Sequence, residues 1–250
     1  MVSFIQALIL SFVQGITEWF PISSSGHLAL TQHLLGVHDL GLVVYLHFAS
    51  VLGVVILFWK EIIDLVVKKK VKYIVRLAIA IIPVAIIGLW LREHIRNAFS
   101  SLFFIGVFFI IFGFFIYFTK YTKEVKKKPS ISDSIFIGIS QVFSLFPGVS
   151  RSGMTMGSGL ILGLKKGEAI RFSFLLAIPL IFGASLIEAR EIALSDISII
   201  TFITSFTVTL LVSLLTIRYL IKIIKSNKFH LFGIYNMILG VIVVAWSLFG

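Results

Sequence analysis

Long runs of uncharged, apolar residues constrain this chain more than any other feature. Leu40–Trp59 is a run of 20 residues without Asp, Glu, Lys or Arg. About 20 such residues in a helix cross the hydrocarbon core of a bilayer. Further apolar runs lie at Tyr73–Leu91, Asn97–Thr119, Phe172–Ile187, Ile197–Ile217 and Phe229–Phe249. The sequence therefore predicts an all-α polytopic membrane protein with about six transmembrane helices.

The composition supports the same class of protein. The chain of 250 residues is 58% hydrophobic and only 13% charged, whereas a soluble domain is about a quarter charged. The predicted spans use most of the length, so we expect one integral membrane domain over residues 1–250. The absence of Cys excludes disulfides and thiolate metal sites. The Lys and Arg residues behind the net charge of +11 are expected to lie in the cytoplasmic loops of a membrane protein. No nucleic-acid partner is therefore expected.

Basic residues are concentrated in alternate loops of the predicted threading. The segments 60–76, 120–128, 165–171 and 218–228 hold 18 of the 22 Lys and Arg residues. Cytoplasmic loops carry such an excess of positive charge. The bias therefore predicts that these four segments face the cytoplasm. It also predicts that the interrupted segment near the N-terminus opens to the opposite side of the membrane.

Two polar stretches interrupt the apolar sequence, QGITEWFPISSSGHL at 14–28 and FPGVSRSGMT at 146–155. Pro21 and Pro147 break a helix in each, so we expect two re-entrant helix–loop–helix segments. Both stretches contain the pattern S-x-S-G, and the two copies are 127 residues apart. This spacing predicts an inverted repeat with halves of about 1–125 and 126–250. In such repeats the broken helices meet near the bilayer midplane and form the site.

The two stretches carry the residues that suit phosphate chemistry. Glu18 and His27 are costly inside an apolar segment, so a function is expected for them. Ser24 or a neighbouring hydroxyl is a candidate nucleophile, and His27 is a candidate base. Glu18 could orient His27, bind a divalent cation or act as the base itself. Gln14 precedes Glu18 by one helical turn, on the same helical face, and could position water or the hydration shell of a metal.

The remaining candidates would bind phosphate. Arg151 offers a forked cation that matches phosphate oxygens. Free backbone N–H groups where the helices restart also attract anions. The predicted phosphate-binding residues are Ser23, Ser25, Ser150, Arg151, Ser152 and Thr155. Simpler interpretations exist, since the serines could serve only to cap broken helices and Arg151 could serve only to pair with Glu18. His47, alone within a span, is expected to be a packing or cavity residue.

The residues alone leave the reaction open. Hydrolysis of a phosphorylated lipid and its transport across the membrane both fit a broken-helix anion site. A transporter or flippase needs anion binding but no nucleophile beside a base. A small-anion channel is the weaker alternative, because it predicts several basic residues along the spans and only Arg151 lies there.

The strings QGITEWFPISSSGH and PGVSRSGMT resemble the two signature motifs of the undecaprenyl-diphosphatase family, the bacitracin-resistance type of membrane phosphatase. The run FSFLLAIP at 172–179 and the basic loops resemble that family too. The resemblance covers essentially the whole chain. It implies removal of the terminal phosphate from a polyprenyl diphosphate, which yields the monophosphate carrier of cell-envelope glycan synthesis and is associated with bacitracin resistance.

The resemblance also implies a site and its surroundings. Gln14 and Glu18 occupy the positions of an E/Q-x-x-x-E pair that is implied to hold the metal. Many members have Glu at the first position, and the Gln14 amide oxygen is a weaker ligand than a carboxylate. Ser23 and Ser24 match the family's hydroxyl pair, and His27 matches its catalytic histidine. Ser24 is the preferred nucleophile, and His27 is the alternative. Ser150, Arg151 and Thr155 match the phosphate-binding set. A divalent cation, Mg²⁺ or Ca²⁺, a homodimer, and a cell-membrane location with an extracytoplasmic active site are implied as well. The partners are then the polyprenyl diphosphate and membrane lipids.

Overall fold

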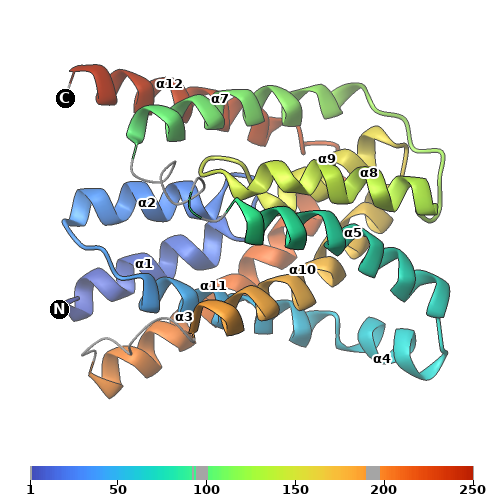
Figure 1. Ribbon diagram of the computed structural model, residues 1–250, viewed down its shortest axis with the longest axis horizontal. Helices are drawn as coiled ribbons and strands as arrows, with labels where there is room; N and C mark the ends of the chain where they lie inside the picture. The colour runs from blue at the N-terminus through green and yellow to red at the C-terminus, as the bar shows by residue number, and fades with distance from the viewer. Residues whose placement is uncertain (1, 92, 94–100, 190–197, 250) are drawn as a thin grey trace.

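The computed structural model describes residues 2–91, 93, 101–189 and 198–249, and these residues are overwhelmingly helical (Figure 1). A single parallel bridge between Lys126 and Leu164 is the one β-type pairing in those ranges. The α-helices are α1 Phe4–Thr17, α2 Ser24–Leu35, α3 Leu40–Leu57, α4 Trp59–Val67, α5 Val71–Trp90, α7 Leu102–Phe118, α8 Ile131–Val142, α9 Arg151–Ile161, α10 Lys166–Ala189, α11 Ile199–Lys225 and α12 Leu231–Phe249; two 3₁₀ turns are η1 Thr119–Tyr121 and η2 Phe143–Leu145.

Six of the described helices, α3, α5, α7, α10, α11 and α12, are long and apolar enough to cross a membrane. Their apolar side chains remain widely exposed, as the lipid-facing surface of a bundle requires. The predicted all-α polytopic fold is therefore confirmed, and the protein is a multi-pass membrane protein.

The ends of some spans differ from the prediction. Helix α10 begins at Lys166 rather than Phe172, and α11 continues past Ile217 to Lys225. Basic residues were expected to lie in loops, but Lys and Arg near a helix end can extend their stems toward the interface while the backbone stays helical. The predicted starts at Asn97 and Ile197 lie outside the described residues. The first span was expected to continue to Trp59, but α3 ends at Leu57, and the segment after Trp59, expected to be a loop, lies largely in the short helix α4.

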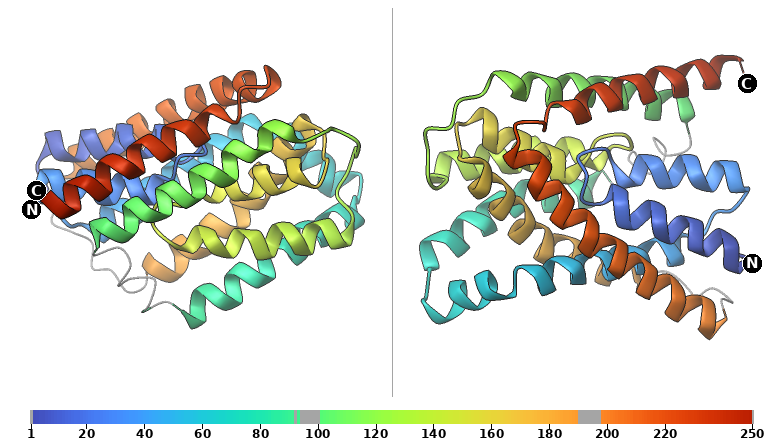
Figure 2. Two further views of the ribbon diagram at one scale, coloured as in Figure 1. Left: turned by 90° about the horizontal axis from the view of Figure 1, so that it is seen from above. Right: turned by 180° about the vertical axis from the view of Figure 1, so that it is seen from behind.

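The two broken segments each fold as a pair of short helices. Helices α1 and α2 contact each other, as do α8 and α9, and Figure 2 shows α1 and α2 running side by side. Ser3 caps α1 and Ser130 caps α8, each through a capping box. The predicted breaks at Pro21 and Pro147 are thus present. That the segments re-enter the membrane, and that the two halves form an inverted repeat, stay predictions.

Helices α7 and α12 form the closest pair in the bundle because glycines face each other along it. A Cβ on Gly113 would lie 2.8 Å from the Gly233 oxygen, and one on Gly240 would lie 2.6 Å from the Gly106 oxygen. Only Gly permits such an approach of two backbones. The close pairing brings the inner face of α12 to the first break, where Asn236 Nδ2 donates to the Pro21 oxygen over 2.9 Å.

Several of the described connections between helices are rich in Lys and lie at the same end of the molecule. The described connections around residues 68–70, 119–130 and 162–165 gather at the end of the molecule opposite both termini (Figure 1). These connections contain many of the Lys residues of the sequence. The fold therefore places the basic loops together, as the charge bias predicts for one side of a membrane.

Candidate active site

The first break turns the chain between α1 and α2 and presents the serines. Ser23 has a φ of 67°, in the left-handed region that a residue with a Cβ rarely occupies. In this conformation its hydroxyl accepts from the Gly26 N–H over 3.3 Å and from the Gly148 N–H over 3.1 Å. Because Gly148 belongs to the second break, Ser23 joins the two breaks directly. Its hydroxyl therefore holds the two breaks together, and its contact with phosphate stays a prediction.

The second break also contains a serine that caps the helix after it. Ser150 caps α9 by accepting from the Gly153 N–H over 3.1 Å, and it lies 3.0 Å from the Ser152 hydroxyl. Ser152 in turn donates to the Trp19 oxygen of the first break over 3.3 Å. Since α2 and α9 both begin here, their N-terminal N–H groups and dipoles favour a negative charge at this position.

The two motif glycines let the breaks touch. A Cβ on Gly26 would lie 2.6 Å from the Phe109 ring and 3.0 Å from the Gly148 nitrogen. A Cβ on Gly153 would lie 2.4 Å from the Phe112 ring and 3.0 Å from the Pro21 Cβ. Each glycine thus packs both on α7 and on the opposite break, so a side chain at either position would push the two breaks apart.

A buried ion pair lies between the breaks. Arg151 Nη2 donates to Glu18 Oε1 over 2.7 Å, and the two side chains are only 11% and 6% exposed. The guanidinium also lies over the Trp19 ring, 5.6 Å from its centroid. Trp19 is fully buried and packs edge-on against Phe174 of α10. The prediction that the two stretches meet is therefore met by direct contacts between residues 133 positions apart.

The second oxygen of Glu18 faces the candidate nucleophile. Ser24 Oγ donates to Glu18 Oε2 over 2.6 Å, and Gln14 Nε2 lies 3.2 Å from the same oxygen. A hydroxyl that already donates to a carboxylate is poised to lose its proton to it. The geometry thus pairs Ser24 with Glu18.

His27, predicted as the base for Ser24, faces elsewhere. Its Nδ1 lies 2.8 Å from the Ser23 carbonyl oxygen, and its Nε2 lies 2.7 Å from the Tyr235 hydroxyl on α12. Among the described residues no hydrogen bond links His27 to Ser24 or Glu18. His27 lies one turn of α2 after Ser24, and both nitrogens of its ring have hydrogen-bond partners of their own.

The other predicted residues are close to the ion pair. The Thr155 hydroxyl donates to the Arg151 oxygen over 3.0 Å and lies 2.6 Å from the Ser173 hydroxyl of α10. It is buried and fixes the first turn of α9 rather than facing an open site. Ser25 is partly exposed at the start of α2, with its hydroxyl 3.2 Å from that of Ser23.

Sequence analysis missed one close neighbour of Glu18. His47 was expected to be a packing or cavity residue with no part in the site, and its Nε2 lies 3.5 Å from Glu18 Oε2. Its Nδ1 lies 2.8 Å from the Val43 carbonyl oxygen, which orients Nε2 toward the carboxylate. The available signal was an imidazole within a run free of formal charges, which is itself uncommon in a membrane span.

Several buried polar atoms of the site have no hydrogen-bond partner among the described residues. They include Gln14 Oε1, Arg151 Nη1 and Trp19 Nε1. An unpaired guanidinium N–H suits a phosphate oxygen, and an unpaired amide oxygen suits a hard cation. The described residues contain no cluster of three His, Cys, Asp or Glu side chains placed to hold a metal. Gln14 and Glu18 therefore offer part of a cation site that other ligands would complete.

Together the fold and the site define a multi-pass membrane protein in which a carboxylate, a guanidinium and a hydroxyl meet where two broken helices come together. The chain belongs to the family described as bacitracin resistance protein BacA, which matches residues 7–242. The family resemblance carried by the two motifs is thus confirmed.

Relatives over almost the full length agree with this assignment. An undecaprenyl-diphosphatase of Methanococcus vannielii is 38% identical over 248 residues, which cover 95% of this chain and 98% of the relative. One of Halothermothrix orenii is 34% identical, with 96% of both chains covered. One of Bacteroides thetaiotaomicron is 33% identical, with 98% of this chain and 100% of the relative covered.

Proposed function

We propose that this protein is an undecaprenyl-diphosphatase, which removes the terminal phosphate of a polyprenyl diphosphate to give the monophosphate lipid carrier. The observation that carries the proposal is the contact of Ser24 with Glu18, whose other oxygen holds Arg151. A nucleophile, a proton acceptor and a phosphate-binding cation thereby meet at one point. The same name on the relatives supports this function.

The reaction follows from these positions. The unpaired N–H of Arg151 and the N-terminal N–H groups of α2 and α9 would hold the terminal phosphate. Ser24 Oγ attacks the terminal phosphorus and passes its proton to Glu18, while the bond to the bridging oxygen breaks and the polyprenyl monophosphate leaves. Water then cleaves the phosphoserine, which releases inorganic phosphate and restores the Ser24 hydroxyl.

The proposal includes a divalent cation, Mg²⁺ or Ca²⁺. Gln14 Oε1 and Glu18 would hold it, and the substrate phosphates would supply further ligands, as is common for Mg²⁺. When bound, the cation would neutralise negative charge on the diphosphate. The fit rests on the buried amide oxygen of Gln14 that has no partner among the described residues.

The proposal also includes the location, the orientation and the oligomeric state of the enzyme. The family and the six apolar helices support a location in the cell membrane. The gathering of basic connections at the end opposite the termini supports an active site that opens to the extracytoplasmic side. The family resemblance is the basis for a homodimer, which the mass of the detergent-solubilised protein would test.

The test is phosphate release from undecaprenyl diphosphate by purified protein in detergent, with Mg²⁺, Ca²⁺ or EDTA. We expect release by wild type and by the control Ser226→Ala, whose hydroxyl lies in the connection after α11. Release should be lost in Ser24→Ala. Folded wild type that binds the lipid without hydrolysing it would contradict the proposal and favour the transporter alternative.

A further inference from the structure

The His27 ring is held by aromatic residues from two helices that are distant in sequence. Tyr235 of α12 lies nearly parallel to it, with an interplanar angle of 9° and centroids 5.8 Å apart. Phe109 of α7 meets it edge-on, with centroids 5.4 Å apart. The close pairing of α7 with α12 therefore fixes the position and the tilt of the imidazole.

The hydrogen bonds of His27 determine its tautomer. The Ser23 carbonyl oxygen, 2.8 Å from Nδ1, can only accept, so Nδ1 carries the proton. In neutral imidazole Nε2 then has a lone pair, and the Tyr235 hydroxyl, 2.7 Å away, donates to it. The carbonyl thus selects this tautomer, because in the alternative Nδ1 would face it without a proton, and the Tyr235 hydroxyl, which can donate or accept, supplies the partner for Nε2.

The carbonyl that His27 contacts belongs to the strained residue of the first break. Ser23 has the left-handed φ of 67° and immediately precedes Ser24. A non-Gly residue in this region costs of order 1–3 kcal/mol and persists only where its surroundings enforce it. The hydrogen bond from His27 Nδ1 on one side and the Gly148 N–H on the other provide that support.

We propose that Tyr235 is a positioning residue for the hydrolytic site. It donates to His27 Nε2 and holds the ring where protonated Nδ1 donates to the Ser23 carbonyl, so that Ser24 stays aligned with Glu18. This inference rests on the proposed function for its kinetic consequence. It gives His27 the role of a support for the turn that carries the nucleophile, in place of the base for Ser24.

Tyr235→Phe keeps the stacked ring and removes only the hydroxyl, so it isolates the hydrogen bond. Because small misplacements of a nucleophile are costly, we expect kcat to fall by about 10-fold or more. The KM for undecaprenyl diphosphate should stay within about two-fold, since the proposed phosphate-binding N–H groups are retained. Tyr121→Phe, at the exposed turn η1, serves as the matched control and should behave as wild type.

Nitrogen NMR of the His27 ring measures the protonation and hydrogen bonding of its two nitrogens. A Tyr235 that only contributed to packing would leave both signals unchanged in Tyr235→Phe. In wild type we expect a proton on Nδ1 and a hydrogen-bonded Nε2. In Tyr235→Phe the Nε2 signal should shift toward that of a ring nitrogen without this donor. The wild-type spectrum tests the tautomer even if the variant does not fold.

The outcomes separate this inference from the proposed function. Wild type without hydrolytic activity would contradict the proposed function. An active wild type with the proton on Nε2 of His27 would overturn the inference alone. So would a folded Tyr235→Phe protein with unchanged kcat and an unchanged Nε2 signal.

Discussion

Two ion pairs in this protein have the same distance between nitrogen and oxygen, but one is buried and the other is more exposed to solvent. Arg151 and Glu18 are 2.7 Å apart, with side chains 11% and 6% exposed. Lys166 and Glu124 are also 2.7 Å apart, with side chains 23% and 39% exposed. Distance alone does not distinguish them, so burial must account for any difference in their effects.

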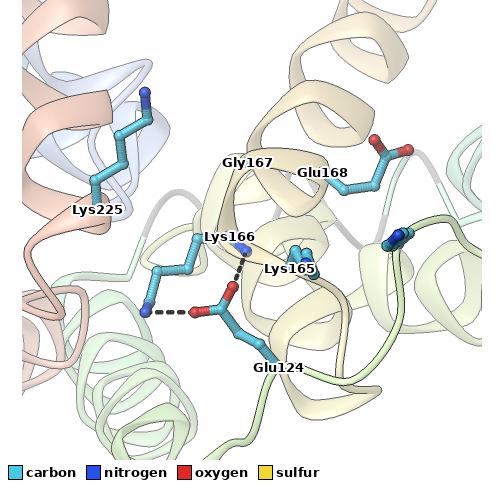
Figure 3. A pocket seen from close by; sticks show the side chains of 7 residues that line it. Glu124, Lys165, Lys166, Gly167, Glu168 and Lys225 are labelled. Atoms are coloured by element: carbon cyan, nitrogen blue, oxygen red, sulfur yellow. Dashed lines mark hydrogen bonds and ion pairs between the residues drawn. The ribbon is translucent and has the colours of Figure 1, made fainter.

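The exposed pair lies at the rim of a hollow of about 500 Å³ near the start of α10. Figure 3 shows Lys166 reaching Glu124 through its side chain and its backbone N–H, while the Lys165 and Lys225 side chains lie apart from that carboxylate. Water and salt screen such a pair, and it contributes little. The buried pair joins two breaks of the fold, and loss of either partner leaves a charge without compensation.

The largest effect is expected from Arg151→Ala, which leaves the Glu18 carboxylate buried without its cation. Breaking a buried pair costs about 3–5 kcal/mol in the free energy of unfolding. Loss of a donor to the phosphate should also lower kcat by about 10²–10³-fold. Thermal unfolding in detergent and steady-state phosphate release measure the two effects.

Lys166→Ala is the matched control for the exposed pair and should lower stability by less than about 1 kcal/mol. The double variant Glu18→Gln/Arg151→Gln should recover part of the lost stability but none of the activity, because it removes both buried charges. Equal destabilisation by Arg151→Ala and Lys166→Ala would contradict the comparison.

The next effect concerns the cation. Chelation with EDTA should remove activity, and added Mg²⁺ or Ca²⁺ should restore it. Gln14→Glu places a second carboxylate beside Glu18 and should lower the cation concentration needed for half-maximal activity, because charge strengthens a hard-cation site. Full activity in EDTA for both proteins would show that the buried carboxylate acts without a metal.

A smaller effect is expected from His47→Ala. The imidazole lies 3.5 Å from Glu18 Oε2, and we expect that its loss lets the carboxylate shift and lowers kcat by about 10-fold. His33→Ala is the control, because that ring packs on Trp246 away from the ion pair. Unchanged kcat in His47→Ala would return His47 to the packing role expected from sequence.

The smallest effect is expected at the exposed pair, and it depends on pH. The Lys166 side chain and backbone N–H hold the pKa of the Glu124 carboxyl below its ordinary value. A lowered folded-state pKa gives stability above the ordinary pKa that is lost as pH falls through the folded pKa. Wild type should thus exceed Glu124→Gln in stability by less than about 1 kcal/mol at neutral pH.

That difference should shrink in acid, as Glu124 is protonated, and also in molar salt, which screens exposed charges. Unfolding temperatures of both proteins at neutral and acidic pH, with and without salt, measure it. A difference that grows as the pH falls would contradict the assigned sign.

Much of the fold and part of the site could be predicted from the sequence. Apolar length located the six spans, because the bilayer imposes a helix length. Pro21 and Pro147 located the two breaks, and costly polar residues indicated Glu18 and Arg151, which the structure brings into contact. These features follow from composition and local pattern, which a single sequence contains.

The rest depended on packing between distant segments. The contacts of His27 require α12 to lie against α7, and the sequence does not state which face of α12 turns inward. Tyr235 is 208 residues from His27, and a lone Tyr in an apolar span has no local signal. The contact of His47 with Glu18 likewise depends on how α3 packs against α1.

The central claim is that Ser24, activated by Glu18, attacks the terminal phosphorus. Its most direct test is to quench the enzyme during turnover of undecaprenyl diphosphate and locate covalent phosphate by mass spectrometry, in acid and in alkali to preserve phosphoserine and phosphohistidine respectively. The account predicts phosphate on Ser24, and none on this peptide in Ser24→Ala. Phosphate on His27 in the active wild type would contradict it.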